Sequence, residues 1–88
     1  MSTETYINHP NFGLLYQICQ IQENQELFTT LYAQRLFFVV TYNGNKVNFE
    51  SVGRSDARLL VENRLRHLRR LGLTQECQAL TVIHKRTF

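Results

Sequence analysis

No apolar run in this chain of 88 residues is long enough to cross a lipid bilayer, which takes about 20 consecutive apolar residues. The first ten residues, MSTETYINHP, lack the basic segment followed by an apolar one that marks a secretory signal. Both features predict a cytoplasmic protein that contacts no membrane. Only two cysteines, Cys19 and Cys77, are present, and neither belongs to a CxxC pair. We therefore expect two reduced thiols rather than a disulfide or a metal site.

Motifs that would indicate an enzyme are missing as well. His9, His67 and His84 are scattered, without HExxH or another metal-ligand spacing. The chain has no glycine-rich phosphate loop, and no serine or cysteine stands in a nucleophile motif. A chain this short hardly encloses a pocket with converging catalytic groups. The sequence predicts a protein that is not an enzyme and that carries no metal or cofactor.

The composition is that of a folded protein, with 43% apolar and 11% aromatic residues. A domain of this size buries only about 60–65% of the surface of its unfolded chain, so its stability margin is thin. Charge is divided unevenly along the chain. Up to Gly53, two basic and four acidic residues give −2, whereas from Arg54 onward eight basic and three acidic residues give +5. Two segments of opposite sign indicate two structural units with different surfaces.

The longest apolar, β-branched and aromatic stretch is Glu26–Tyr42, which alternates in two halves and predicts two neighbouring strands. Two further segments alternate in the same way, and the polar residues before Pro10 are expected to precede the first strand. At least four short antiparallel strands in about fifty residues favour a small β-barrel of the SH3 or Tudor type. The predicted strands are Leu14–Gln22, Leu27–Ala33, Leu36–Tyr42 and Lys46–Val52.

Beyond Gly53 the apolar period changes to that of a helix. Ser55 is a candidate N-cap, and Gly72 is placed to end this first helix. Thr74 is expected to cap a second helix over about Gln75–Thr87, antiparallel to the first. The expected buried stripe of the first helix consists of Ala57, Leu60, Val61, Leu68 and Leu71, with Leu59 and Leu65 outside it.

The predicted fold is thus mainly β with α: a small Tudor/SH3-like β-barrel over residues 1–53, followed by an antiparallel two-helix hairpin over 54–88. The second helix has the weaker apolar stripe. Burial of Leu80 and Ile83 contributes about 2 kcal/mol apiece. Ordering about thirteen residues costs roughly 1–2 kcal/mol each in backbone entropy, before hydrogen bonds are counted. We therefore expect this helix to dock marginally.

Two surfaces are candidates for binding. Tyr32, Arg35 and Leu36 lie at the corner between the two central strands, and tyrosine and arginine are enriched at protein interfaces. The alternative is that they are ordinary strand residues with one side packed.

The second candidate is the arginine-rich face of the first helix, which has the charge to neutralise phosphates. It has two alternatives, a solvated face with an internal Glu62–Arg66 pair and a dock for acidic protein loops. We favour these two because the helix contains no aromatic residue on which a base could stack.

Four segments of the chain form specific motifs: NHPNFGLLYQIC (Asn8–Cys19), ELFTTLYAQRLFF (Glu26–Phe38), GRSDARLLVENRLRHLRR (Gly53–Arg70) and RTF (Arg86–Phe88). Together they resemble the PipX family of small cyanobacterial nitrogen-control proteins, and the resemblance runs nearly end to end. It implies a Tudor-like barrel followed by two helices. It also implies an adaptor that is not an enzyme and is a monomer when free.

The resemblance further implies two alternative partners. One is the trimeric signalling protein PII, bound when it carries ADP and 2-oxoglutarate is scarce, with its extended T-loops held against the adaptor. The other is the transcription factor NtcA, a dimer of the CAP type, bound in its 2-oxoglutarate-loaded form, on which the adaptor is a coactivator. One barrel surface serves both partners, so the two complexes exclude each other. The effector belongs to the partners, and neither a small-molecule site nor a direct DNA contact is expected on this chain.

Several contact positions of the family match residues of this chain. Glu23 stands where the family has an acidic residue. A protein-binding surface is therefore expected at Tyr32, Gln34, Arg35 and Leu36, with Phe12, Tyr16, Glu4 and His9 nearby. The alternative function is that of a small nucleic-acid-associated SH3/Tudor-like protein that uses the arginine-rich helix.

Overall fold

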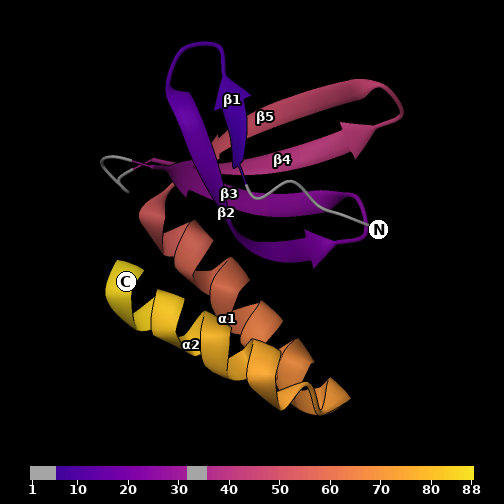
Figure 1. Ribbon diagram of the computed structural model, residues 1–88, viewed down its shortest axis with the longest axis vertical. Helices are drawn as coiled ribbons and strands as arrows, with labels where there is room; N and C mark the ends of the chain where they lie inside the picture. The colour runs from indigo at the N-terminus through magenta and orange to yellow at the C-terminus, as the bar shows by residue number, and fades with distance from the viewer. Residues whose placement is uncertain (1–5, 32–35) are drawn as a thin grey trace.

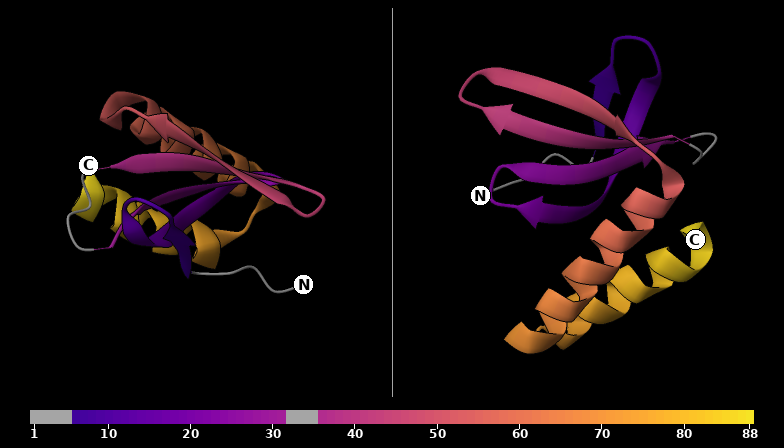
Figure 2. Two further views of the ribbon diagram at one scale, coloured as in Figure 1. Left: turned by 90° about the horizontal axis from the view of Figure 1, so that it is seen from above. Right: turned by 180° about the vertical axis from the view of Figure 1, so that it is seen from behind.

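The computed structural model describes residues 6–31 and 36–88, which form an antiparallel five-stranded sheet followed by two helices (Figure 1). The sheet curls into a half-barrel, and the helices lie antiparallel to each other against one of its faces (Figure 2). The predicted Tudor-like barrel with a C-terminal helical hairpin is confirmed. The spatial order of the strands is their order in the chain: β1 (Tyr6–His9), β2 (Gly13–Gln22), β3 (Gln25–Thr30), β4 (Phe37–Asn43) and β5 (Lys46–Val52). The helices are α1 (Arg54–Leu71) and α2 (Thr74–Thr87).

The two central strands send alternate side chains into two different cores. Phe37 and Val39 of β4 face the helices, whereas Phe38 and Val40 line the inside of the curl. A register shift in β2 between Gln17 and Cys19 reverses the alternation of its side chains. Leu15, before the shift, lies in the core inside the curl, whereas Cys19, after it, lies in the core on the helix side. The helix-side core contains Ile18, Cys19, Leu27, Phe37, Val39, Ala57, Val61, Leu65, Leu68 and Leu80. The core inside the curl contains Leu15, Phe28, Phe38 and Val40.

Strand β1 is not predicted by the sequence pattern, which places its residues ahead of the sheet. The strand pairs with the beginning of β2, where Tyr6 lies opposite Tyr16 and His9 opposite Gly13. Its side chains are alternately exposed and half-buried, and Ile7 packs against the core inside the curl. A four-residue edge strand with one aliphatic side chain gives too weak an alternation to be recognised, because backbone pairing with β2 supplies much of its stability.

Both expected helix caps are wrong, by two residues at α1 and by one at α2. α1 begins at Arg54 with Gly53 in the N-cap position, so Ser55 already lies inside the helix. α2 begins at Thr74 after Leu73, so Thr74 is the first helical residue and not the cap. Neither N-cap residue makes a side-chain hydrogen bond to the helix.

The end of α1 is as expected. Gly72 adopts a left-handed conformation with φ of 73°. Its N–H donates to the carbonyl of Arg69 at 3.1 Å, and the N–H of Leu73 donates to the carbonyl of Leu68 at 3.0 Å. This pair of bonds is the Schellman motif, in which glycine takes the left-handed position at no steric cost.

The buried stripe of α1 differs from the prediction at two positions. Leu65, expected outside the stripe, is 6% exposed, whereas Leu71, expected inside it, is 56% exposed. Leu65 is buried because it belongs to the core shared by the sheet, α1 and Leu80 of α2. Leu71 lies in the last turn of α1, at the end of the hairpin that is remote from the sheet (Figure 2).

The C-terminal end of α2 is joined to the sheet and to the start of α1. The rings of Phe37 and Phe88 stack with their centroids 5.3 Å apart. Nη2 of Arg54 donates to the carbonyl oxygen of Thr87 at 2.7 Å, and its guanidinium lies 5.6 Å from the centroid of the Phe88 ring. These contacts fix the last turn, whereas Leu80 and Thr87 are the buried residues of α2 itself.

Hydrogen exchange measures how firmly α2 is docked. We expect amides in residues 80–86 to exchange at least about tenfold faster than those of residues 37–40, because β4 is buried from both faces and α2 from one. The measurement is amide exchange followed by NMR at one pH and temperature. Equal protection of the two segments would show that α2 opens only when the whole protein unfolds.

A charged cluster joins the two helices at Glu62. Its Oε2 lies 3.0 Å from Nε of Arg58 and 3.1 Å from Nε2 of His84, and hydrogen bonds to these two groups lower the pKa of the carboxyl. The expected Glu62–Arg66 pair is wrong, since Arg66 donates to Oδ1 of Asn63 instead. The sequence pattern does not reveal the bond to His84 because it is a tertiary contact with the other helix, 22 residues further along the chain.

Acid is expected to weaken this link. Since the folded pKa of Glu62 lies below its ordinary value of 4.5, its stabilising contribution is present above that pH and is lost as pH falls through the lowered pKa. We expect the wild type to be more stable than Glu62→Gln at neutral pH and the difference to shrink toward zero in acid. Thermal unfolding of both proteins across pH measures it. A difference that stays constant down to strongly acidic pH would contradict this role of the carboxylate.

Candidate protein-binding surface

Leu36 is held by its backbone while its side chain reaches solvent. Its carbonyl oxygen accepts two hydrogen bonds, from the backbone N–H of Thr30 at 3.2 Å and from Oγ1 of Thr29 at 2.8 Å. The residue is nevertheless 39% exposed. A fixed backbone under an exposed aliphatic side chain suits a contact residue, because little conformational entropy is lost on binding.

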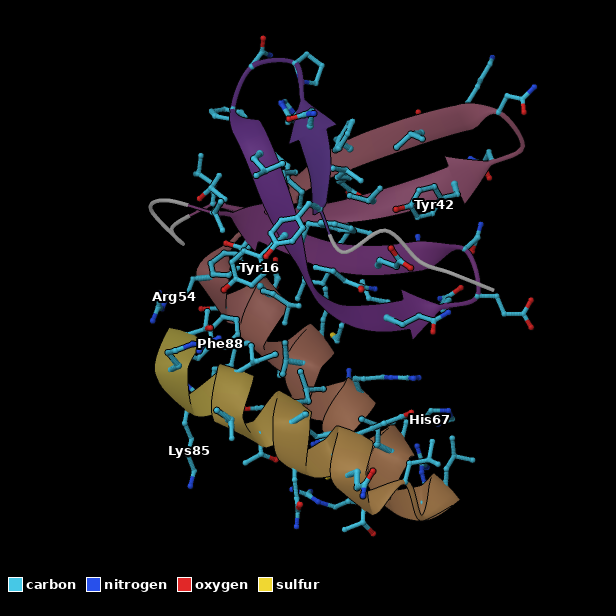
Figure 3. The ribbon with its side chains drawn as sticks, viewed as in Figure 1. Tyr16, Tyr42, Arg54, His67, Lys85 and Phe88 are labelled. Carbon is cyan, nitrogen blue, oxygen red and sulfur yellow. The ribbon has the colours of Figure 1, made fainter. Side chains whose placement is uncertain are left out.

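Tyr16 lies in a row of paired residues that crosses the sheet. It is opposite Tyr6 of β1 and Thr29 of β3, and Thr29 is opposite Phe37 of β4. Paired residues share a face, so Tyr16 lies on the helix-side face, and Figure 3 shows it on the same side of the molecule as Phe88. Its hydroxyl is buried and has no hydrogen-bond partner among the described residues. Because this hydroxyl is buried, Tyr16 can meet a partner only through the half-exposed part of its side chain.

His9 and Phe12 belong to an aromatic cluster inside the curl. The His9 ring lies 5.0 Å from the rings of Phe12 and Phe38 and 4.7 Å from that of Phe49, measured between centroids. Nδ1 of His9 accepts hydrogen bonds from the backbone N–H groups of Asn11 at 3.0 Å and Phe12 at 3.3 Å. The ring proton is therefore on Nε2, and the turn between β1 and β2 is held against the sheet. Phe12 stays 50% exposed on top of this cluster.

The structure gathers part of the predicted surface at one end of the sheet. The backbones of Tyr16 and Phe37 are two strands apart, a distance of about 10 Å, and Leu36 comes directly before Phe37 in the chain. His9 and Phe12 lie beside the start of β2, on the opposite face from Tyr16. Glu23 lies in the turn after β2, about 20 Å along the strand from Tyr16, so the structure does not bring it to the others. The predicted residues Glu4, Tyr32, Gln34 and Arg35 lie outside the described residues.

Tyr6 is an exposed residue that the sequence analysis did not select. It is 51% exposed and pairs with Tyr16, so two tyrosines lie side by side at this edge of the sheet. No sequence signal marks Tyr6, because the alternation of its four-residue strand is too short to be recognised.

The described residues offer little that chemistry or metal binding could use. Within residues 6–31 and 36–88, no three His, Cys, Asp or Glu side chains come close enough to hold a metal ion. Burial raises the pKa of the Cys19 thiol to about 12, although the positive charge of Arg64 opposes the shift, so the thiolate is scarce at neutral pH. No helix of this part of the protein is long and apolar enough to span a membrane.

The arginine-rich face of α1 is partly engaged in bonds within the protein. Arg58 pairs with Glu62, Arg66 with Asn63, and Arg54 with the carbonyl of Thr87. Such bonds match the expected solvated, internally paired face, although the glutamate partner differs from the expected one.

The fold and its surface define a class: a small half-barrel with a helical hairpin that presents exposed aromatic and aliphatic residues at one end of its sheet. The comparison with family models then gives the family. The model of PipX, PII-interacting protein X, matches residues 3–88, and the chain belongs to this family. It is accordingly a PII-interacting regulatory protein at the family level. The comparison with curated proteins gave no match.

Proposed function

We propose that this protein is a non-enzymatic adaptor of nitrogen regulation that binds either of two regulators through one surface of its half-barrel. One partner is the PII trimer in its ADP-bound form when 2-oxoglutarate is scarce. The other is the 2-oxoglutarate-loaded NtcA dimer, on which the adaptor acts as a coactivator. The free adaptor is a cytoplasmic monomer whose sheet unit, residues 1–53, carries the surface, and whose helical unit, residues 54–88, supports it.

The observation that carries the proposal is the combination at Leu36 and Tyr16. Leu36 is 39% exposed on a backbone held by two hydrogen bonds, and the half-exposed Tyr16 lies in register with Thr29 and Phe37 at the same end of the sheet. Preorganised aromatic and aliphatic side chains of this kind carry most of the binding energy in protein interfaces. The family resemblance adds Tyr32, Gln34, Arg35 and Glu4 to the proposed surface, whereas Glu23, about 20 Å along β2 from Tyr16, is left out of it.

Sharing one surface makes the two complexes exclusive without a switch in the adaptor. A ligand shifts an equilibrium only through its different affinities for the two states. Here 2-oxoglutarate acts on the partners, so it redistributes the adaptor by changing how well each partner binds it. Neither a small-molecule site nor direct contact with DNA is needed on this chain, and no observation favours the nucleic-acid alternative.

Binding measured against effector concentration tests the proposal. We expect PII with ADP to bind the adaptor and to lose affinity at least about tenfold when 2-oxoglutarate is added, a coupling of about 1.4 kcal/mol. NtcA is expected to gain affinity with the same effector. Calorimetric titrations of each purified pair measure both. An affinity for PII and NtcA that does not respond to 2-oxoglutarate would remove the regulatory part of the proposal.

A further inference from the structure

A second surface with the character of a binding site lies at the far end of the helical hairpin. Where α1 turns into α2, the structure contains an apolar groove of about 430 Å³ lined by Leu68, Leu73, Cys77, Thr81 and Val82, with Arg69 at its rim. In Figure 2 this bend is the part of the hairpin most remote from the sheet. The groove therefore lies away from Leu36 and Tyr16, which are at the sheet.

Large aliphatic side chains gather around this groove. Leu73 is 40% exposed and Val82 is 60% exposed, and both line the groove. Single exposed aliphatic residues are ordinary, but two that line the same groove offer a partner a shared apolar surface. Their burial by a partner would remove apolar surface from water, which is the main driving force of association.

The surroundings of the groove are positively charged. Arg69 lines it, Arg70 precedes Leu71, and a furrow of about 260 Å³ between the helices continues from Arg69 past Arg66 and Lys85. The acidic residues of this half of the chain do not offset this charge. Glu62 is bonded to Arg58 and His84, Asp56 lies at the opposite end of α1, and Glu76 lines a different hollow beside β2.

We propose that this groove binds an acidic amphipathic helix of another protein, whose aliphatic side chains enter between Leu73 and Val82 while its carboxylates face Arg69 and, along the furrow, Arg66 and Lys85. An amphipathic helix presents apolar residues at i, i+3, i+4 and i+7, which matches a narrow groove continued by a furrow along two helices. A second copy of the hairpin does not suit the site, because residues 54–88 carry a net charge of +5 and would repel one another.

This proposal is independent of the PII and NtcA assignments, since it uses no residue of the surface at the sheet. Its consequence is that the adaptor presents two contacts at once. A protein held by the half-barrel leaves the hairpin bend available for a second, different protein.

Cys77 provides a direct readout because its side chain lines the groove. The only other thiol, Cys19, is 8% exposed with its pKa raised to about 12, so a maleimide added to the folded protein modifies Cys77. The probe is a synthetic helical peptide with leucines at i, i+3, i+4 and i+7 and glutamates on its polar face. We expect saturating peptide to slow maleimide modification of Cys77 at least about tenfold, and added salt to weaken this protection.

Two variants and one control peptide make the test specific. Val82→Asp places a negative charge in the groove and is expected to abolish protection, whereas Leu59→Asp, at a site 55% exposed on α1 outside the groove, leaves it unchanged. Each rate is compared with that of the same variant without peptide. A peptide with lysines in place of the glutamates is expected not to protect. Equal protection by both peptides, no protection by either, or self-association that Val82→Asp abolishes would each overturn the proposal.

Discussion

A Leu36→Asp variant is expected to bind PII and NtcA at least about thirtyfold more weakly than the wild type, a loss of about 2 kcal/mol with each partner. The substitution puts a carboxylate into a contact that we propose is apolar, where it would be desolvated without a partner. The fold is expected to survive, because Thr29 and Thr30 bond to the backbone carbonyl of residue 36, which the substitution leaves in place. Titration of each partner with the variant measures the loss.

Val47→Asp is the matched control. Val47 is 45% exposed, close to the 39% of Leu36, and it lies on β5 next to the β4–β5 turn, away from Tyr16. We expect this variant to bind both partners as the wild type does. Tyr32→Ala is expected to lose as much affinity as Leu36→Asp, since Tyr32 belongs to the same proposed surface. A folded Leu36→Asp protein that binds normally would remove Leu36 from the interface.

Phe37→Ala is expected to destabilise the protein by about 3–5 kcal/mol, which is most of the stability of a domain of this size. The Phe37 ring is 1% exposed, belongs to the core between sheet and helices, and stacks on Phe88. Its removal leaves a cavity where β4 meets the end of α2. Chemical denaturation followed by circular dichroism measures the free energy of unfolding.

The same truncation at an exposed ring separates core packing from loss of an aromatic ring as such. Phe12 is 50% exposed and contacts His9 and Phe38. Phe12→Ala is expected to cost no more than about 1.5 kcal/mol, the range of an aromatic contact. If Phe37→Ala cost no more than Phe12→Ala, the core between sheet and helices would not hold α2 as described.

The sequence predicted the parts of this fold that depend on local pattern. The strands at Leu14–Gln22 and Lys46–Val52 alternate cleanly and lie within a residue of their predicted bounds, and Gly72 ends α1 by the left-handed conformation that glycine favours. The edge strand Tyr6–His9 was not predicted because only one of its side chains is aliphatic. Its position depends on pairing with β2, which a single segment does not reveal.

What the sequence could not predict depends on contacts between distant segments. Leu65 is buried in a core that the sheet, α1 and Leu80 of α2 share, and Glu62 bonds to His84 because the hairpin brings the two helices together. Neither contact can be predicted from the apolar period of α1 alone. For the surface, the sequence pointed to Leu36 through its position at a strand corner. The buried hydroxyl of Tyr16, which has no hydrogen-bond partner within residues 6–31 and 36–88, became visible only in the folded sheet.

The central claim is that one surface of the half-barrel holds either regulator but never both. It is tested most directly by mixing the adaptor with PII and NtcA together, in the presence of ADP and at a 2-oxoglutarate concentration at which each partner alone binds. Size-exclusion chromatography with light scattering then gives the mass of every complex. The account predicts two binary complexes whose proportions shift with 2-oxoglutarate. A ternary complex in which one adaptor molecule joins PII to NtcA, and which Leu36→Asp dissolves, would contradict it.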